Sequence, residues 1–317
     1  MYDILYIIIH PEAFMTDLTA FQREISHFLP NINLQFNEPM AKHTSFRIGG
    51  PAEVMAFPKN AQQLAEILKV SKMLDIKPAI LGAGTNVLAP DGGIQGLVVC
   101  IKDELSCITR LDDTRIRVDA GASMTKAAVY AANAGLSGLE FAHGIPGSVG
   151  GGVYMNAGAY GGEIKDVCTS VEIMTLDGVL HTYTAAEMGF SYRHSRLEEE
   201  QAIVVSATFA LQPKPTEEIR NLMQELATKR KASQPLDKPS AGSAFKRPVG
   251  GYAAALIDSA GLKGYQVGGA AISEKHAGFA VNLGGATAAD VKNLLSQVSD
   301  IVFEKSGIRL EPEVRIW

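Results

Sequence analysis

The chain has 317 residues, of which 46% are hydrophobic and 20% are charged, and its formal net charge is −5. A chain of this length exceeds the size at which a single hydrophobic core usually stops growing, so we expect two domains, and the composition excludes an intrinsically disordered protein. The net negative charge leaves no basic field to hold nucleic acid, so we expect no nucleic-acid partner.

The N-terminal segment has the composition of an extension. The apolar run at residues 4–9 is far too short to span a bilayer, so we expect no membrane partner. Met15 begins a more ordinary helical start. We therefore interpret residues 1–14 either as an extension or as a product of the choice of start site, and residues 1–35 as this segment plus a lead-in helix.

An α/β unit follows. Residues 52–58, AEVMAFP, form an apolar run that predicts a strand, and residues 60–76 show the apolar spacing of a helix behind an Asn60 cap. A second strand in 77–81 then enters the glycine-rich turn LGAGTN, residues 81–86. This order of strand, helix, strand and loop predicts an α/β unit whose loop lies at the end of a strand.

Two further strands and a helix come before the next glycine-rich segment. GLVVCI, residues 96–101, and TRIRVDAG, residues 114–121, are typical of strands. A helix is predicted from Met124 to Ala134, because Gly135 has the residue type expected just past a helix end.

The second half of the chain changes composition near residue 212. Before that point the pattern is β-rich, with a hairpin predicted at Asp177-Gly178 and a buried strand in residues 202–211. After it, two prolines precede a predicted helix with Thr216 at its cap. We therefore place the domain boundary between residues 212 and 213.

The last predicted helix begins at Thr287, where Asp290 has the spacing of a capping box, and it runs to Gly307. The final ten residues, IRLEPEVRIW, are expected to be extended.

Two glycine-rich segments carry the first functional hypothesis. Residues 144–162 contain eight glycines in nineteen positions. Such density indicates left-handed turns or close contact with a ligand, and the alternative of a flexible linker conflicts with apolar residues such as Ile145 and Val149.

LGAGTN lacks the third glycine of a dinucleotide fingerprint, since residue 87 is valine, so a nicotinamide Rossmann site and a Walker A loop are both disfavoured. Two glycine loops at strand ends nevertheless suit a ligand with a central pyrophosphate, so we predict a dinucleotide site.

Seven motifs in order resemble one family of bacterial flavoenzymes, the UDP-N-acetylenolpyruvoylglucosamine reductases (MurB). The resemblance runs from about residue 36 to the end of the chain. The motifs are TSFRIGGPAE (44–53), ILGAGTNVL (80–88), GIPGSVGG (144–151), YMNAGAYGGEI (154–164), FSYRHS (190–195), AGSAFKRP (241–248) and LEPEVRIW (310–317).

The resemblance implies an α/β (α+β) fold class. It comprises an FAD-binding domain of the vanillyl-alcohol-oxidase (PCMH) type in two α/β subdomains, residues 36–212, and a C-terminal α/β substrate-binding domain, residues 213–317, whose last strand contributes to the active site. It further implies non-covalent FAD, NADPH as co-substrate, and transfer of hydride from the reduced flavin to C3 of UDP-N-acetylglucosamine enolpyruvate. The product is UDP-N-acetylmuramate, a cytoplasmic peptidoglycan precursor, and we expect a monomer with small-molecule partners only.

The resemblance also assigns residues to cofactor binding. The two glycine loops are expected to line FAD, with Arg47 as a nearby cation whose alternative role is a surface ion pair. The expected cofactor residues are Arg47, Gly82, Ala83, Gly84, Thr85, Asn86, Val87, Gly144, Ile145, Pro146, Gly147, Ser148, Gly150 and Gly151.

The chemistry requires a cation for an enolate-like intermediate and a proton donor to C2. Arg193 resembles the family's catalytic arginine, Ser243 its proton donor and Glu313 the carboxylate that completes the site. Glu311, two residues earlier on the same predicted strand, is the neighbour most easily confused with Glu313.

Substrate contacts are expected from Tyr192, Lys246, Arg247, Lys275 and Asn282, although many relatives have asparagine at the position of Arg247. Fifty positions separate Arg193 from Ser243 and contain no tyrosine, which is typical of the family's shorter-loop (type II) form. Some other residue must then contact the diphosphate.

The remaining residue types add limits and alternatives. The three cysteines show no CxxC spacing and cannot all pair, which indicates a reducing compartment, the cytoplasm. The histidines show no metal spacing, so we expect no metal site. Two alternative functions stay open, an FAD oxidase or dehydrogenase of the same superfamily with another substrate and a non-catalytic protein that binds a sugar nucleotide.

Overall fold

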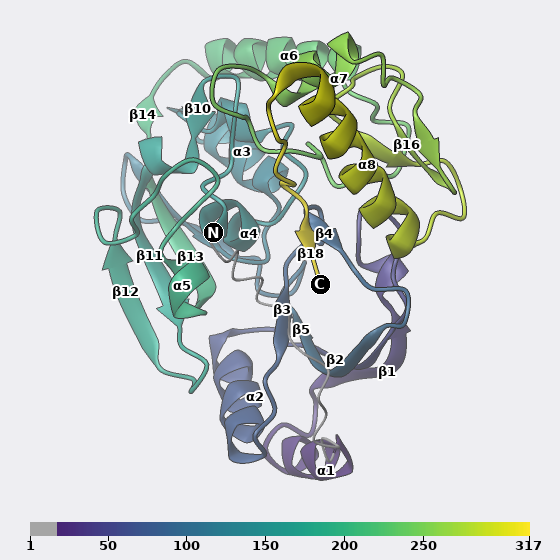
Figure 1. Ribbon diagram of the computed structural model, residues 1–317. Helices are drawn as coiled ribbons and strands as arrows, with labels where there is room; N and C mark the ends of the chain where they lie inside the picture. Colours follow the sequence, from purple (N-terminus) through teal and green to yellow (C-terminus); the bar gives the residue numbers. More distant parts are fainter. Residues whose placement is uncertain (1–17) are drawn as a thin grey trace.

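The structure, a computed structural model, describes residues 18–317 (Figure 1). The predicted extension over residues 1–14 and the helical start at Met15 lie outside the described residues. The first described element is helix α1, Leu18–Phe28, within the predicted lead-in segment.

The first lobe is built on a four-stranded sheet in the order β1-β2-β5-β3. Strand β1 is antiparallel to β2, whereas β2, β5 and β3 are mutually parallel. Helices α1 and α2 bury Phe21, Ile25 and Leu64 against one face of this sheet, and Met55 and Val98 belong to a separate buried cluster. The elements are β1 (Asn33–Pro39), β2 (Pro51–Phe57), α2 (Ala61–Met73), β3 (Ala79–Leu81), β4 (Val87–Leu88) and β5 (Ile94–Cys100).

Burial of the strands on both sides explains why they read as continuous apolar runs. The predicted cap of α2 is confirmed, because the side chain of Asn60 accepts a hydrogen bond of 2.9 Å from the backbone N–H of Gln63.

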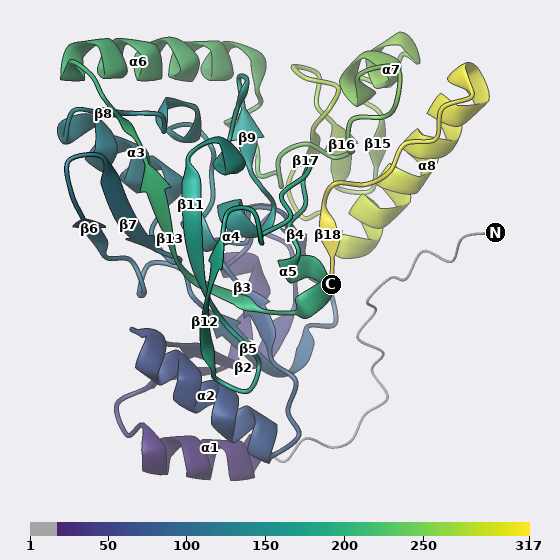
Figure 2. The same ribbon diagram turned by 90° about the vertical axis from the view of Figure 1, so that its left-hand side faces the viewer.

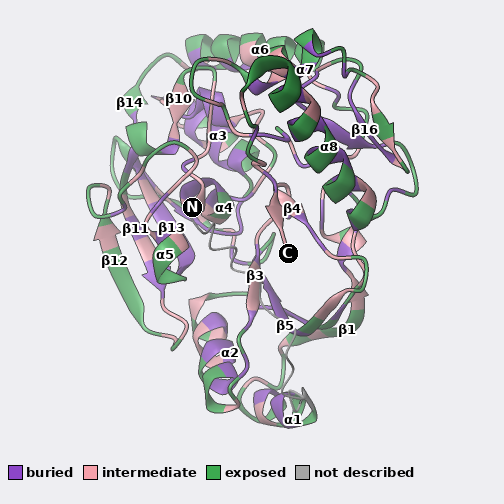
Figure 3. Ribbon diagram, in the orientation of Figure 1, coloured by how far each residue is buried: buried purple, intermediate pink, exposed green. Residues whose placement is uncertain are grey.

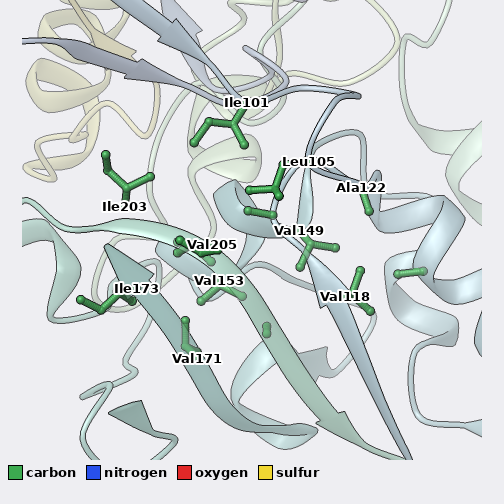
Figure 4. Packing of buried hydrophobic residues seen from close by; sticks show 14 of the residues in the cluster. Ile101, Leu105, Val118, Ala122, Val149, Val153, Val171, Ile173, Ile203 and Val205 are labelled. Atoms are coloured by element: carbon green, nitrogen blue, oxygen red, sulfur yellow. The ribbon is translucent and has the colours of Figure 1, made fainter. Parts of the chain in front are cut away.

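The second lobe is a five-stranded antiparallel sheet in the order β12-β11-β13-β7-β6. The predicted hairpin is confirmed between β11 and β12, where Gly178 has φ +78°. Helix α4 packs Val149 and Val153 onto this sheet beside Val171 and Val205 (Figure 4). The elements are β6 (Ile108–Arg110), β7 (Arg115–Asp119), α3 (Met124–Asn133), β8 (Leu136–Ser137), α4 (Val149–Tyr154), β9 (Gly158–Ala159), β10 (Gly162–Glu163), β11 (Cys168–Met174), β12 (Leu180–Thr184), α5 (Leu197–Glu200) and β13 (Ile203–Ala210).

Helix α6, Thr216–Ser233, belongs by its packing to the second lobe. Ile219 and Met223 join the same buried cluster as α3 and the five-stranded sheet, and α6 lies across α3 and β8 (Figure 2). The helix begins one residue earlier than predicted, because Pro215 is the N-cap and Thr216 is already helical. Thus the helix that composition assigned to the second domain completes the core around α3 and the five-stranded sheet. The predicted boundary between residues 212 and 213 stays a prediction.

The C-terminal unit has its own buried core of small and aliphatic side chains. A three-stranded antiparallel sheet packs against α7 and α8, and the predicted capping box of Thr287 and Asp290 is confirmed. The elements are α7 (Ala253–Ser259), β15 (Gln266–Val267), β16 (Ala270–Ile272), β17 (Ala280–Asn282), α8 (Ala288–Ser306) and β18 (Arg315–Ile316). Strand β14 (Gln212–Pro213), which precedes α6, pairs instead with β8 of the second lobe.

The end of the chain returns to the first lobe. Strand β18 pairs in parallel with β4, which directly follows the first glycine loop, so the C-terminus lies in the middle of the molecule (Figure 1). Segments of mainly intermediate burial meet around this point, while α6 and α8 expose their outer faces (Figure 3).

Candidate active site

The two glycine loops predicted from the sequence touch each other. The Thr85 hydroxyl donates a hydrogen bond of 3.0 Å to the Pro146 carbonyl. A Cβ added at Gly82 would lie 2.6 Å from the Ser148 hydroxyl oxygen, and one added at Gly84 would lie 1.9 Å from the His43 carbonyl oxygen. Part of the demand for glycine therefore comes from packing within the chain, beyond any contact with a ligand.

These loops line a continuous cleft of about 2960 Å³ between the two lobes and the C-terminal unit. Among the predicted cofactor residues, Gly144 is absent from this lining, and an added Cβ there would meet the side chain of Arg230. The predicted residues that do line the cleft are Arg47, Gly82, Ala83, Gly84, Thr85, Asn86, Val87, Ile145, Pro146, Gly147, Ser148, Gly150 and Gly151.

Arg47 lies exposed in a left-handed conformation with φ +57°. Among the described residues no carboxylate forms an ion pair with it, so the alternative reading as a surface ion pair has no support in the structure.

Arg193 and Glu313, 120 positions apart in the sequence, form an ion pair at the cleft. The Arg193 Nε donates to Glu313 Oε1 at 2.8 Å, and Nη2 donates to the Gly158 carbonyl at 3.3 Å. Arg193 lies in a tight turn closed by Ser191 and His194, with φ +56°. A non-glycine residue in this region is uncommon and often marks a functional site.

Ser243 is brought to the same wall by backbone pairing. Ser243 forms an isolated antiparallel β-bridge with Phe279, and Phe245, two residues later, forms another with Pro312. Between them, the Ala244 carbonyl accepts a hydrogen bond of 3.0 Å from the Glu313 N–H. Ser243 is exposed at the cleft, which it lines together with Arg193 and Glu313. The structure thus brings the three predicted catalytic residues together, from three separate segments.

The surroundings of the two C-terminal glutamates differ sharply. The side chain of Glu313 is 13% exposed, and burial raises its pKa while the charge and hydrogen bond of Arg193 oppose that rise. The side chain of Glu311 is 67% exposed and pairs with Lys246. Only Glu313 has the buried, cation-paired environment of a functional carboxyl group.

The predicted substrate residues are placed unevenly. Lys246 lines the cleft, whereas Tyr192, Arg247, Lys275 and Asn282 are not among the residues that line it. Asn282 is buried and donates to the Phe46 carbonyl at 2.9 Å, and Lys275 donates to the Lys231 carbonyl at 2.6 Å. These bonds support structural roles, and the substrate contacts of these four residues stay predictions.

Arg230 is a cleft residue that the sequence did not single out. Its Nε and Nη1 atoms are buried without a hydrogen-bond partner among the described residues, and burial lowers the pKa of this guanidinium while Tyr160 opposes the change. In the sequence it lies in a basic run that is typical of a helix C-terminus. Only the packing of the folded chain shows that these guanidinium nitrogens are buried. Because buried polar groups are normally hydrogen-bonded, a ligand with an acceptor oxygen would suit this position.

A second ion pair adjoins the first. Arg315 donates to Glu198 at 2.6 Å and 2.8 Å, and the hydrogen bonds and charge of Glu198 raise the pKa of Arg315. Both residues line the cleft. Sequence reasoning missed this pair because its members are 117 positions apart.

Within residues 18–317, no group of three or more His, Cys, Asp or Glu side chains is arranged to hold a metal ion. In the same part of the chain, no helix combines the length and apolarity needed to cross a membrane.

Comparison with known families agrees with this architecture. Residues 52–184 match the family model described as FAD binding domain, and residues 234–317 match that of the UDP-N-acetylenolpyruvoylglucosamine reductase C-terminal domain. The chain is thus an FAD-binding oxidoreductase with a separate C-terminal domain, and the predicted fold class is confirmed.

Full-length relatives give the family. The chain is 49% identical over 308 residues to the UDP-N-acetylenolpyruvoylglucosamine reductase of Agathobacter rectalis, covering 94% of this chain and 98% of that protein. It is 46% identical to the enzyme of the same name from Caldanaerobacter subterraneus, over 92% and 96% of the two chains. The crystal structure of UDP-N-acetylenolpyruvylglucosamine reductase (MurB) from Thermus caldophilus superposes with a TM-score of 0.76, at 37% identity, covering 90% of this chain and 99% of that one. The chain belongs to the UDP-N-acetylenolpyruvoylglucosamine reductase family.

Proposed function

We propose that this chain reduces UDP-N-acetylglucosamine enolpyruvate to UDP-N-acetylmuramate, with NADPH as reductant and FAD as bound cofactor, for peptidoglycan precursor synthesis. The observation that carries the proposal is the Arg193–Glu313 ion pair at the cleft, with Ser243 held beside Glu313 by backbone pairing. Predicted cytoplasmic location and the monomeric state belong to the same proposal.

The residues present fit FAD. Backbone N–H groups of two glycine loops suit phosphate oxygens, and the cleft is large enough for a dinucleotide beside a second ligand. Arg230 offers two nitrogen atoms that have no hydrogen-bond partner within residues 18–317. Residues 82–87, 145–148, 150 and 151 would hold the cofactor. When bound and reduced by NADPH, the flavin would supply the hydride that adds to C3 of the enolpyruvyl group.

The chain's own residues supply the remaining chemistry. Addition at C3 places negative charge on C2 and the carboxylate, and the Arg193 guanidinium, oriented by Glu313, suits that charge. The Ser243 hydroxyl then gives its proton to C2. Because burial raises the pKa of Glu313, this carboxyl exchanges protons closer to neutral pH than an exposed glutamate does.

We further propose the shorter-loop (type II) form of the family. The segment between Arg193 and Ser243 contains no tyrosine, and its only long helix, α6, packs on the second lobe. Lys246, which lines the cleft, is then the leading candidate for the diphosphate.

An absorbance spectrum and an NADPH oxidation assay test the proposal. We expect flavin bands, release of intact flavin on acid precipitation, and NADPH oxidation that depends on the enolpyruvate. A superfamily oxidase with another substrate predicts oxidation that is indifferent to this compound. A non-catalytic sugar-nucleotide binder predicts a protein that stays colourless in excess FAD, and either result would overturn the proposal.

Ser243→Ala tests the proton donor. Because only the proton to C2 is lost, we expect flavin reduction by NADPH to stay near the wild-type rate while reoxidation by the enolpyruvate slows by about 10²- to 10⁴-fold. Stopped-flow absorbance measures both half-reactions. Ser306→Ala, at the end of α8 outside the cleft, is the matched control. Equal losses in both half-reactions would contradict the assignment.

A further inference from the structure

Tyr192 connects the two segments that carry the predicted catalytic residues. Its ring lies beneath the guanidinium of Arg193, with 5.1 Å between the guanidinium carbon and the ring centroid. Its hydroxyl accepts a hydrogen bond of 3.2 Å from the backbone N–H of Arg247. One side chain therefore touches Arg193 from the FAD domain and the segment that follows Ser243 in the C-terminal unit.

Both attachment points need to be held. Arg193 has φ +56°, a backbone conformation that persists only where surrounding contacts hold it. Arg247 lies four residues after Ser243, in a segment that is held by isolated β-bridges at Ser243 and Phe245 and belongs to no strand. An extra hydrogen bond at Arg247 therefore limits the movement of the segment that positions the Ser243 hydroxyl.

The contacts of Tyr192 argue against the substrate-binding role expected from the sequence. It is not among the residues that line the cleft, although the adjacent Arg193 is. Its hydroxyl already has a backbone partner and one ring face is occupied by a cation, while 48% of the residue faces solvent.

We propose that Tyr192 is a positioning residue that keeps the Arg193 guanidinium and the Ser243 segment in register for proton delivery to C2. This inference rests on the proposed roles of Arg193 and Ser243. The ring orients Arg193 through a cation–π contact, and the hydroxyl anchors the Arg247 backbone.

Two substitutions separate these contributions. Tyr192→Phe removes only the hydrogen bond, and we expect the rate of flavin reoxidation at saturating enolpyruvate to fall about three- to tenfold. Tyr192→Leu also removes the aromatic ring, and we expect a further loss of about two- to fivefold. The KM for the enolpyruvate and the rate of flavin reduction by NADPH should each stay within about twofold of wild type.

A readout independent of turnover is amide hydrogen exchange in the peptide that contains Arg247. We expect faster exchange there in Tyr192→Phe than in wild type, because the N–H loses its acceptor. The matched control is Tyr183→Phe. Tyr183 likewise lies under an arginine, Arg196, at 4.5 Å and bonds a neighbour, Glu200, at 3.0 Å, but neither partner belongs to the segment that follows Ser243.

Three results would overturn the inference. A raised KM at unchanged kcat would make Tyr192 a substrate-binding residue. Faster exchange at Arg247 without slower reoxidation would leave the hydrogen bond a structural one. Unchanged exchange would show that the bond does not restrain this segment. If wild-type reoxidation proves indifferent to the enolpyruvate, the proposed function fails, and the exchange comparison still tests the bond itself.

Discussion

At the scale of single residues, the surroundings of a side chain distinguish residues of the same type that the sequence could rank only by their order within a motif. Glu311 and Glu313 are identical and two positions apart, yet one is exposed beside Lys246 and the other is buried against Arg193. Motif order favoured Glu313, and the contacts of the two side chains supply the physical reason.

The titration of Glu313 gives a prediction for stability. Burial raises its pKa above the ordinary value of 4.5, so the folded state holds this proton more tightly than the unfolded state does. The resulting stabilisation is fully present below pH 4.5 and is lost as the pH rises through the raised pKa. Glu313→Gln cannot ionise, so the free energy of unfolding of wild type minus that of the variant should fall over this window. The fall should be about 1.4 kcal/mol for each pH unit that separates the two pKa values.

Urea unfolding at several pH values between about 4 and 8 measures this difference. Glu311→Gln, which removes a carboxylate at the exposed neighbouring position, serves as control. A flat difference for Glu313→Gln would show that its pKa is not raised by burial.

At the scale of elements, local patterns predicted regular helices and hairpins well. Asn60, the Asp177-Gly178 turn and the Thr287–Asp290 capping box act through neighbours within four residues, so the sequence contains the whole interaction. Helix α4 was not predicted, since glycine is a poor helix former and three of its six residues are glycine. Packing of Val149 and Val153 on the sheet overrides that preference.

Gly84→Ala tests the first glycine loop. An alanine Cβ would meet the His43 carbonyl oxygen and would have to adopt φ +62°, so the loop must move. We expect the free energy of unfolding of the apoprotein to fall by about 1–3 kcal/mol and FAD to bind at least about tenfold more weakly. Urea unfolding and titration of flavin fluorescence measure the two effects.

The control for this substitution is Gly251→Ala, where an added Cβ meets nothing within 4 Å and φ is not in the left-handed region. This variant should match wild type in both measurements. Wild-type FAD affinity in Gly84→Ala would show that the exact course of this loop does not matter for the cofactor.

At the scale of the whole molecule, the cleft lies where three units meet. Strand β18 pairs with β4, Asp91 accepts hydrogen bonds from the first amides of α8 at 2.7 Å and 3.1 Å, and Asn282 bonds the Phe46 carbonyl. These contacts fix the C-terminal unit against the first lobe, so a ligand in the cleft touches more than one unit.

This arrangement predicts strong stabilisation by the cofactor. At a free FAD concentration about 100 times its Kd, the free energy of unfolding should rise by about 2.7 kcal/mol, and the Tm by about 5–10 °C. Calorimetry of the apoprotein with added FAD measures the shift, and adenosine diphosphate, which reproduces only part of FAD, should give a smaller one. An unchanged Tm in saturating FAD would contradict a cofactor site between the units.

The sequence by itself determined helices α2, α3, α6 and α8, the β11–β12 hairpin, the Asn60 and Thr287 caps, the two glycine loops and, through seven motifs in order, the family. These features depend on neighbours along the chain or on the motifs themselves. Only the tertiary structure decided that α6 completes the core around α3 and the five-stranded sheet, and that two nitrogens of Arg230 are buried without a hydrogen-bond partner among the described residues. It likewise decided that Tyr192 connects Arg193 to the segment after Ser243. Each of these depends on contacts between residues far apart in sequence, which leave no periodic or local signal because burial and pairing arise only when the units pack together.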